Sequence, residues 1–187
     1  NLHWMTDDGL LALNEKASAL GVPMHMHLLE TQYQKEYAFK RTGTTAVQHL
    51  HKLGVLGPHM TLGHGVWMTQ EDIEICSDTG TCICHNCSSN FRLRSGVLPL
   101  MELQRKGITV GMGMDEAGIN DDRDMLQEMR MALTVHRVPG MDHDGVPSPA
   151  QVLKIATENG GLTTAFGAEI GRLESGRLMD AVIIDYD

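Results

Sequence analysis

The sequence predicts an α/β fold built on parallel strands. Four times along the chain, apolar residues at helical spacing run up to a glycine, and a short apolar stretch follows. The connections between these segments are short, which favours parallel strands joined by right-handed crossovers. On these grounds, either a doubly wound sheet or a (β/α)8 barrel would fit.

Each predicted element rests on a local signal. The first helix places its apolar residues on one face and stops at Gly21. Thr69, with Asp72 three residues later, indicates a capping box at the start of the third helix. The four helix–strand pairs are predicted over 7–20 and 23–29, 44–53 and 60–64, 69–80 and 81–85, and 97–106 and 108–112.

Three further elements follow the fourth strand. A helix is predicted over 122–135, and Ser148 with Pro149 as N-cap and first helical residue opens another that runs to 158. The segment 171–176 is rich in turn residues. The apolar run 178–185 behind it is predicted to be a strand.

Composition excludes several classes of protein. The chain has 187 residues, is 42% hydrophobic and carries a formal net charge of −9, so the positive face that duplex nucleic acid requires is not expected. No apolar run approaches the ~20 residues that span a bilayer, and the first residues do not resemble a secretory signal. The four cysteines all lie within 76–87, and we expect reduced thiols and a cytoplasmic location.

Chemically capable side chains lie at the ends of all four predicted strands. The first ends at His27 and Glu30, the second at His64, the third at His85 and the fourth at Asp115. Since the carboxyl ends of parallel strands share one rim, we expect His27 and Asp115 to be close together with His64 beside them. Imidazole and carboxylate ligands with an open water position suit a hydrolytic Zn²⁺ or Fe²⁺ site.

The cysteine cluster admits two interpretations. Cys82, Cys84 and Cys87 together with His85 could hold a structural zinc ion. However, two of these cysteines fall inside an apolar strand rather than in paired turns. We therefore expect buried, unreactive thiols.

Two histidines are expected outside the site. His25 lies two positions before His27, so strand alternation places it one layer deeper, where we expect a buried and hydrogen-bonded imidazole. His136 falls at the end of a predicted helix. We expect its side chain to be solvated.

The strand-end motifs resemble those of a known family. They are His27-Leu-Leu-Glu30, Leu62-Gly-His64-Gly, His85-Asn-x-Ser-Ser-Asn90 and Gly113-Met-Asp115. Their order and spacing are similar to the second half of the amidohydrolase superfamily barrel, in the branch of cytosine-deaminase-like, adenosylhomocysteine-deaminase-like and triazine-chlorohydrolase enzymes. The resemblance implies the fifth to eighth strands of a (β/α)8 barrel, with the family's His-x-His pair of the first strand outside this sequence. It divides the chain into a partial barrel over 1–167 and, over 168–187, the start of the C-terminal segment of a small β-sandwich domain.

The same resemblance implies roles for individual residues. His27 and Asp115 would bind one divalent metal ion, with Zn²⁺ favoured and Fe²⁺ as the alternative. Glu30 would shuttle protons, Asp115 would also accept a proton from the attacking water, and His64 would orient water or substrate. These roles describe a metal-dependent hydrolase.

The implied activity is hydrolysis of a C–N bond by a metal-activated water, above all the deamination of an amino-substituted heterocycle. His85 and Asn90 would contact this small-molecule substrate. Chlorohydrolase or cyclic-amidase chemistry is the alternative on the same residues, because they do not decide the leaving group. We expect a homo-oligomer with no nucleic-acid or membrane partner.

A further alternative is a non-catalytic fragment that associates with another chain or a second copy. Half of a barrel has two open sheet edges, and open edges are templates for association. We expect the fragment alone to be inactive and its apolar strand residues to be at risk of exposure on the bare inner face. These residues are Met24, Met26, Leu62, Ile83, Val110 and Met112.

Overall fold

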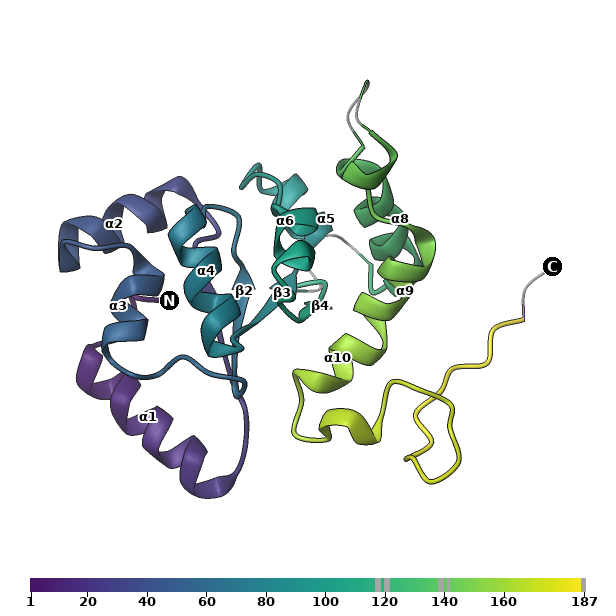
Figure 1. The fold of residues 1–187 in the computed structure, drawn as a ribbon, viewed down its shortest axis with the longest axis horizontal. Coiled ribbons are helices and arrows are strands. Elements are labelled where there is room, and N and C mark those ends of the chain that lie inside the picture. The colour runs from purple at the N-terminus through teal and green to yellow at the C-terminus, as the bar shows by residue number, and fades with distance from the viewer. Residues whose placement is uncertain (117–118, 120–121, 138–139, 141, 186–187) are drawn as a thin grey trace.

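A computed structural model describes residues 1–116, 119, 122–137, 140 and 142–185 (Figure 1). The strands are β1 (Met24–Leu28), β2 (Met60–His64), β3 (Cys82–His85) and β4 (Val110–Met112). The α-helices are α1 (Asp7–Leu20), α2 (Gln32–Thr42), α3 (Ala46–Lys52), α4 (Gln70–Thr79), α5 (Cys87–Arg92), α6 (Leu100–Arg105), α8 (Met125–Val135), α9 (Pro149–Ala156) and α10 (Glu158–Leu162). Two 3₁₀ turns are η1 (His143–Gly145) and η2 (Gly167–Glu169).

The four strands form one parallel sheet in the order β1-β2-β3-β4. A doubly wound sheet reverses its strand order at a switch point, whereas successive strands of a (β/α)8 barrel simply lie side by side. The observed order therefore favours half of a barrel. The predicted parallel α/β architecture is confirmed, and β2 has the predicted bounds.

Polar side chains start most of the predicted helices. Thr69 forms the predicted capping box of α4, and Ser148 is the predicted N-cap of α9 with Pro149 at the first helical position. Ser148 also forms a capping box with Gln151. Asp124 caps α8 by accepting hydrogen bonds from the backbone N–H of Leu126 and Gln127. The predicted start at 122 is therefore wrong by three residues. The backbone of an N-cap residue is not helical, so the helix begins only after Asp124.

Three helices of the described residues were not predicted. In α2 only Gln34 and Ala38 are buried, so its apolar stripe is too narrow to be recognised as helical periodicity. The six-residue α5 and the five-residue α10 are too short to show such a pattern. Tertiary contacts, rather than local propensity, sustain helices of this length.

The apolar strand residues do not line the open inner face, contrary to the prediction. Leu62, Ile83 and Val110 are aligned across the sheet and are at most 1% exposed. They belong to a core shared with the helices, and Met24, Met26 and Met112 pack against it. Because side chains alternate along a strand, the open face of β1 instead carries His25 and His27, which are exposed.

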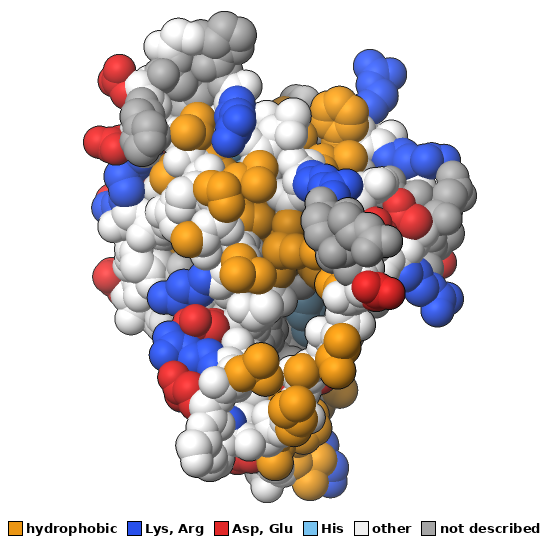
Figure 2. All heavy atoms as spheres, turned by 90° about the vertical axis from the view of Figure 1, so that its right-hand side faces the viewer, with side chains coloured by type: hydrophobic (Ala, Val, Ile, Leu, Met, Phe, Trp, Pro, Cys, Tyr) orange, Lys and Arg blue, Asp and Glu red, His pale blue; other side chains and the backbone are white. Residues whose placement is uncertain are grey.

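The segment 178–185 forms no strand, so this part of the prediction is wrong. A strand exists only where a neighbouring backbone completes its hydrogen bonds, and no described segment forms a ladder with it. Val182 and Ile183 are 85% and 97% exposed. Ile184 lines a groove of about 470 Å³ between α8 and α9, on a face where hydrophobic side chains gather (Figure 2).

The two sheet edges differ in their cover. Along β4, the side chain of Asn159 in α10 donates a hydrogen bond from Nδ2 to the backbone oxygen of Val110 at 2.9 Å. One carbonyl that a further strand would bind is thereby satisfied within the chain. Beside β1, the described residues provide no strand other than β2.

No described helix has the length and apolar composition that crossing a membrane requires.

Asp7 joins the start of α1 to α2 and α3. Its Oδ1 lies 2.6 Å from Arg41 Nη2 and 3.0 Å from His49 Nε2. Arg41 also donates to the backbone oxygens of Leu2 and Met5. The hydrogen bond from His49 lowers the pKa of Asp7 against a smaller opposing effect of burial, and the charges of His49 and Arg41 lower it further.

We expect Asp7→Asn to destabilise the chain at neutral pH by up to about 1 kcal/mol, a small effect because the carboxylate is 37% exposed. A lowered pKa stabilises the folded state above the unfolded-state pKa of about 3.9. That stabilisation is lost as the pH falls through the folded-state pKa. The difference between variant and parent in urea unfolding should therefore vanish in acid.

Asp8→Asn is the matched control, because Asp8 lies in the same helical turn and is exposed. Its unfolding free energy should stay close to that of the parent. Equal effects of the two substitutions would show that Asp7 acts only through the helix dipole.

Candidate functional site

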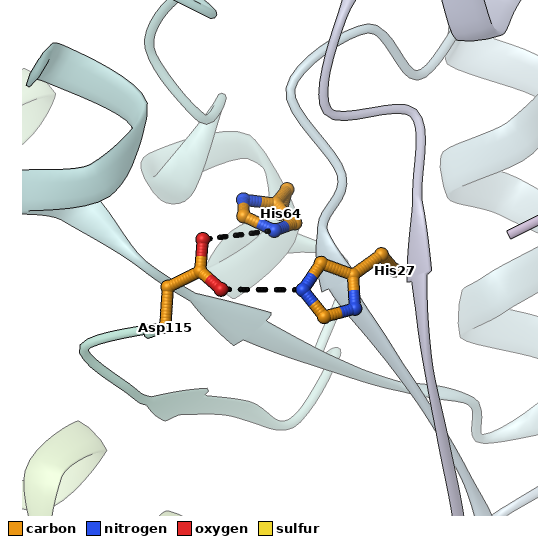
Figure 3. A group of neighbouring side chains, drawn as sticks. All are labelled: His27, His64 and Asp115. Carbon is orange, nitrogen blue, oxygen red and sulfur yellow. Dashed lines mark hydrogen bonds and ion pairs between the residues drawn. The ribbon is translucent and has the colours of Figure 1, made fainter. Parts of the chain in front are cut away.

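His27, His64 and Asp115 meet at the carboxyl end of the sheet (Figure 3). His27 Nε2 lies 3.2 Å from Asp115 Oδ1, and His64 Nε2 lies 3.7 Å from Asp115 Oδ2. One donor atom from each residue falls within 4.8 Å of the other two. The prediction that these three residues converge is confirmed.

Backbone conformation aims two of these side chains. His64 and Asp115 have φ angles of 78° and 62°, in the left-handed region that non-glycine residues seldom adopt. Regular alternation from Leu62 would direct His64 to the helix-covered face. The left-handed residue at the end of β2 breaks this alternation, and the imidazole reaches Asp115. Such strain clusters at functional sites.

The helix α5 holds both His64 and Asp115. Asn90 Oδ1 lies 2.7 Å from His64 Nδ1, and Ser89 Oγ donates to Asp115 Oδ2 at 2.6 Å. Because the amide oxygen can only accept, His64 Nδ1 donates this hydrogen bond. The other ring nitrogen, Nε2, faces Asp115.

Opposing effects set the charge of Asp115. Burial acts to raise its pKa, but hydrogen bonds from Ser89 and His27 and the charges of His64 and His27 outweigh it, so the pKa lies below its usual value. Asp115 is therefore ionised at neutral pH. Carboxylate oxygens and imidazole nitrogens are ligand atoms of the kind that bind Zn²⁺.

Glu30 lies just beyond β1, outside the three-residue group. Its Oε1 accepts a hydrogen bond from Ser95 Oγ and its Oε2 accepts one from Gln34 Nε2, both at 3.3 Å. Gln34 in turn accepts from the backbone N–H of Glu30 at 2.9 Å. The carboxylate is thus oriented by two neighbours while remaining half-buried.

The structure does not bring His85 to an accessible surface. It is 1% exposed, and its Nε2 lies 3.1 Å from Nε2 of His136. Burial lowers the pKa of His85 to about 3 and that of His136 to about 4, so both are neutral at pH 7. The expectation of a solvated His136 is wrong, because the helix end carries it inward onto β3.

Asn90 is also only 1% exposed. Its contact with His64 makes it a neighbour of the group. Contact of either Asn90 or His85 with a substrate stays a prediction. His25 is exposed rather than buried as expected, because no described residue covers the inner face in front of it.

The cysteines are free thiols, and the described metal-ligand group contains none of them. Cys76, Cys82 and Cys87 are buried and Cys84 is half-buried. Burial raises the pKa of Cys76, Cys84 and Cys87 to about 12. The prediction of buried rather than zinc-binding thiols agrees with this placement.

Sequence reasoning missed the residues that orient Asp115 and Glu30. Ser89 stands inside a motif that the resemblance rests on, so its position was a usable signal. Gln34 lies in the first turn of α2 and contacts Glu30, which precedes the N-cap of that helix, and α2 was not predicted. Ser95 gives no local signal, because it reaches Glu30 across 65 positions.

Comparisons with known proteins agree on one family. The model of the amidohydrolase family matches residues 4–187. The 5-methylthioadenosine/S-adenosylhomocysteine deaminase of Syntrophobacter fumaroxidans is 33% identical over 177 residues, which cover 95% of this chain and 40% of the relative. The chain thus spans about two fifths of the length of such curated relatives.

Two solved structures have the same fold over most of the chain. An adenosine deaminase from Xanthomonas campestris with bound zinc is 28% identical, with a TM-score of 0.87 over 92% of this chain and 39% of that one. The atrazine chlorohydrolase of Arthrobacter aurescens, complexed with zinc, is 26% identical, with a TM-score of 0.87 over 92% of this chain and 38% of that one. Both agree with the expectation of a partial barrel.

We expect Gly113→Ala to lower the free energy of unfolding by about 1–3 kcal/mol, the usual cost of overpacking. A Cβ atom at Gly113 would lie 2.6 Å from Asn86 Oδ1 and 2.9 Å from Cys84 Sγ, so the end of β3 would have to shift. Urea unfolding followed by circular dichroism measures the change.

Gly160→Ala is the control, because a Cβ atom there would meet nothing closer than 3.9 Å within α10. This substitution should leave stability unchanged or raise it by less than about 1 kcal/mol. A Gly113→Ala chain as stable as the parent would show that the strand end has room to relax.

Proposed function

The chain belongs to the amidohydrolase family, and from that premise we propose that it is the part of a metal-dependent hydrolase that positions the reacting carboxylates. The observation that carries the proposal is the convergence of His27, His64 and Asp115 within 4.8 Å at the strand ends. These residues lie far apart in sequence and meet only through the parallel sheet. Two imidazoles and an ionised carboxylate fit a divalent metal ion, and we propose Zn²⁺.

The donor set supports this fit. His64 Nδ1 donates a hydrogen bond to Asn90 Oδ1, and Nε2 faces Asp115. Asp115 keeps its charge because Ser89 and His27 hydrogen-bond to it. We assign His27 and Asp115 as ligands, with His64 beside them. Catalytic zinc sites use three or more protein ligands, so further ligands would come from outside this chain.

The proposed chemistry divides among three side chains. A divalent metal ion held here would supply an activated water, because it lowers the pKa of bound water towards ~7. Asp115 would accept a proton from the water, and Glu30, oriented by Ser95 and Gln34, would take a proton from the water and pass it to the leaving nitrogen. His64 orients the water or the substrate through Nε2.

The substrate class we propose is an amino-substituted heterocycle, first the adenine ring of a nucleoside. Two similar proteins bear the names adenosine deaminase and 5-methylthioadenosine/S-adenosylhomocysteine deaminase. Hydrolytic deamination replaces the exocyclic amino group with oxygen and releases ammonia. The test is ammonia release from adenosine-type substrates by the longer protein that includes the preceding coding region, together with its zinc content.

Removal of chloride from a triazine ring is a second candidate. The observation in its favour is the TM-score of 0.87 with the atrazine chlorohydrolase, equal to that with the adenosine deaminase. The same acid–base residues could serve either leaving group. Parallel assays of chloride and ammonia release by one preparation distinguish the two activities.

We expect Glu30→Gln in the longer protein to lower turnover by ~10²- to 10⁴-fold while the zinc content stays unchanged. The amide keeps the shape of the side chain but cannot carry the proton. Stopped-flow or steady-state ammonia release, with metal analysis of the same sample, measures both quantities.

Glu36→Gln is the matched control. Glu36 is exposed on the neighbouring helix and accepts a hydrogen bond from Gln32, so turnover should not change. Loss of zinc from the Glu30→Gln protein, with normal activity per remaining ion, would assign Glu30 to metal binding instead of proton transfer.

The 187-residue chain by itself should bind Zn²⁺ weakly and release no ammonia, because His27, Asp115 and His64 alone make an incomplete site. It should also self-associate through the open edge of β1. Calorimetric zinc titration, light scattering and the ammonia assay test these expectations. A monomeric chain that deaminates a ring substrate would overturn the proposal that the site is shared with a preceding segment.

A further inference from the structure

Glu128 is a buried carboxylate in the first turn of α8 that the proposed chemistry does not use. It is 1% exposed and lies on the same helix as Ala132, which packs with Cys87 and Val152 in a small hydrophobic cluster. A buried carboxylate is costly unless it is hydrogen-bonded. Oε1 of Glu128 accepts a hydrogen bond from the backbone N–H of Ser88 at 2.9 Å.

Ser88 lies in the first turn of α5, where backbone N–H groups lack partners within the helix. The N-cap residue Asn86 would normally accept from such a group, but its side chain makes no capping hydrogen bond. Asn86 instead accepts from Cys84 Sγ at 3.4 Å and places Nδ2 3.5 Å from His64 Nε2. The side chain is turned towards the site, and Glu128 supplies the missing acceptor from another helix.

The helix that Glu128 holds is the one that orients the candidate metal group. Ser89 and Asn90 follow Ser88 directly, and they bind Asp115 and His64. A six-residue helix such as α5 has no stability of its own in water. Its direction, and with it the direction of these two side chains, therefore depends on contacts from outside the helix.

The other end of α8 is also fixed on β3. His136, the C-cap of α8, lies 3.1 Å from His85 through their Nε2 atoms. Glu128, Ala132 and His136 are spaced four residues apart, so they share one face of the helix. Both imidazoles are neutral at pH 7, because burial lowers their pKa values to about 3 and about 4. One can then donate to the other, and α8 is anchored at both ends.

We propose that Glu128 is a positioning residue of the candidate metal centre: by capping α5 from α8, it fixes Ser89 against Asp115 and Asn90 against His64. The link to metal binding rests on the function proposed above. The capping itself does not, so it can be measured in protein without metal.

Two substitutions separate the hydrogen bond from the volume of the side chain. Glu128→Gln keeps an oxygen that can accept from Ser88 N–H, whereas Glu128→Leu fills similar space among apolar neighbours and accepts nothing. Val152→Ala is the matched control, because it opens the same cluster, which includes Cys87 of α5, without removing the acceptor of the Ser88 N–H. Nitrogen NMR of histidine reports which His64 nitrogen carries the proton, and amide hydrogen exchange reports the order of α5.

In metal-free Glu128→Leu we expect the amides of Ser89 and Asn90 to exchange about tenfold faster than in the parent. We also expect a detectable population of His64 with the proton on Nε2. Glu128→Gln and Val152→Ala should retain the parental His64 signals. In the longer protein, Glu128→Leu should weaken zinc binding by about tenfold or more, as loss of partners around metal ligands does.

An unchanged His64 proton position in Glu128→Leu, with exchange in α5 no faster than in Val152→Ala, would overturn the inference. Glu128 would then only fill space. If the longer protein binds no zinc but the His64 and exchange changes occur as expected, the proposed function fails and the capping role of Glu128 stands. If zinc binding is normal and those changes are absent, the proposed function stands and this inference fails.

Discussion

The Asp115 carboxylate is the interaction on which the candidate site depends. It follows the last strand of the sheet and contacts side chains from the first two, His27 on β1 and His64 on β2. Both imidazoles contact its oxygens, and its lowered pKa means that it stays ionised through the neutral range. The carboxylate therefore links the end of β4 to the ends of β1 and β2.

A layer of polar side chains surrounds this carboxylate and explains its geometry. Ser89 and Asn90 come from one short helix, so a single rigid unit sets the directions of Asp115 and His64. Glu30 is held by Gln34 from α2 and by Ser95. The backbone N–H of Ser95 donates to the backbone oxygen of Asn90 at 2.8 Å, so the residues that orient Glu30 and His64 are themselves in contact.

The open face of the sheet carries the polar site. The opposite face, which packs against the helices, is apolar. Alternation along β1 places His25 and His27 on the exposed face and their methionine neighbours against the core. The chain can therefore bury its apolar strand residues without the remaining strands of a barrel. The inner face of the sheet in this chain therefore lacks further polar partners. It does not lack a hydrophobic cover. This fits a segment that spans about two fifths of its curated relatives.

The sequence by itself determined the helix–strand order, the parallel sheet, the cap residues of α4 and α9, and the convergence of His27, His64 and Asp115, because these follow from local spacing and from the shared rim of parallel strands. The sequence also indicated the family, because the motifs at the strand ends are local. Only the tertiary structure decided the rest. The strand predicted over 178–185 needed a partner backbone that the described chain does not offer. The left-handed turn at His64, the inward position of His136, and the contacts of Ser95 and Glu128 join segments distant in sequence. Such contacts arise from tertiary packing, and the periodicity of the intervening residues does not predict them.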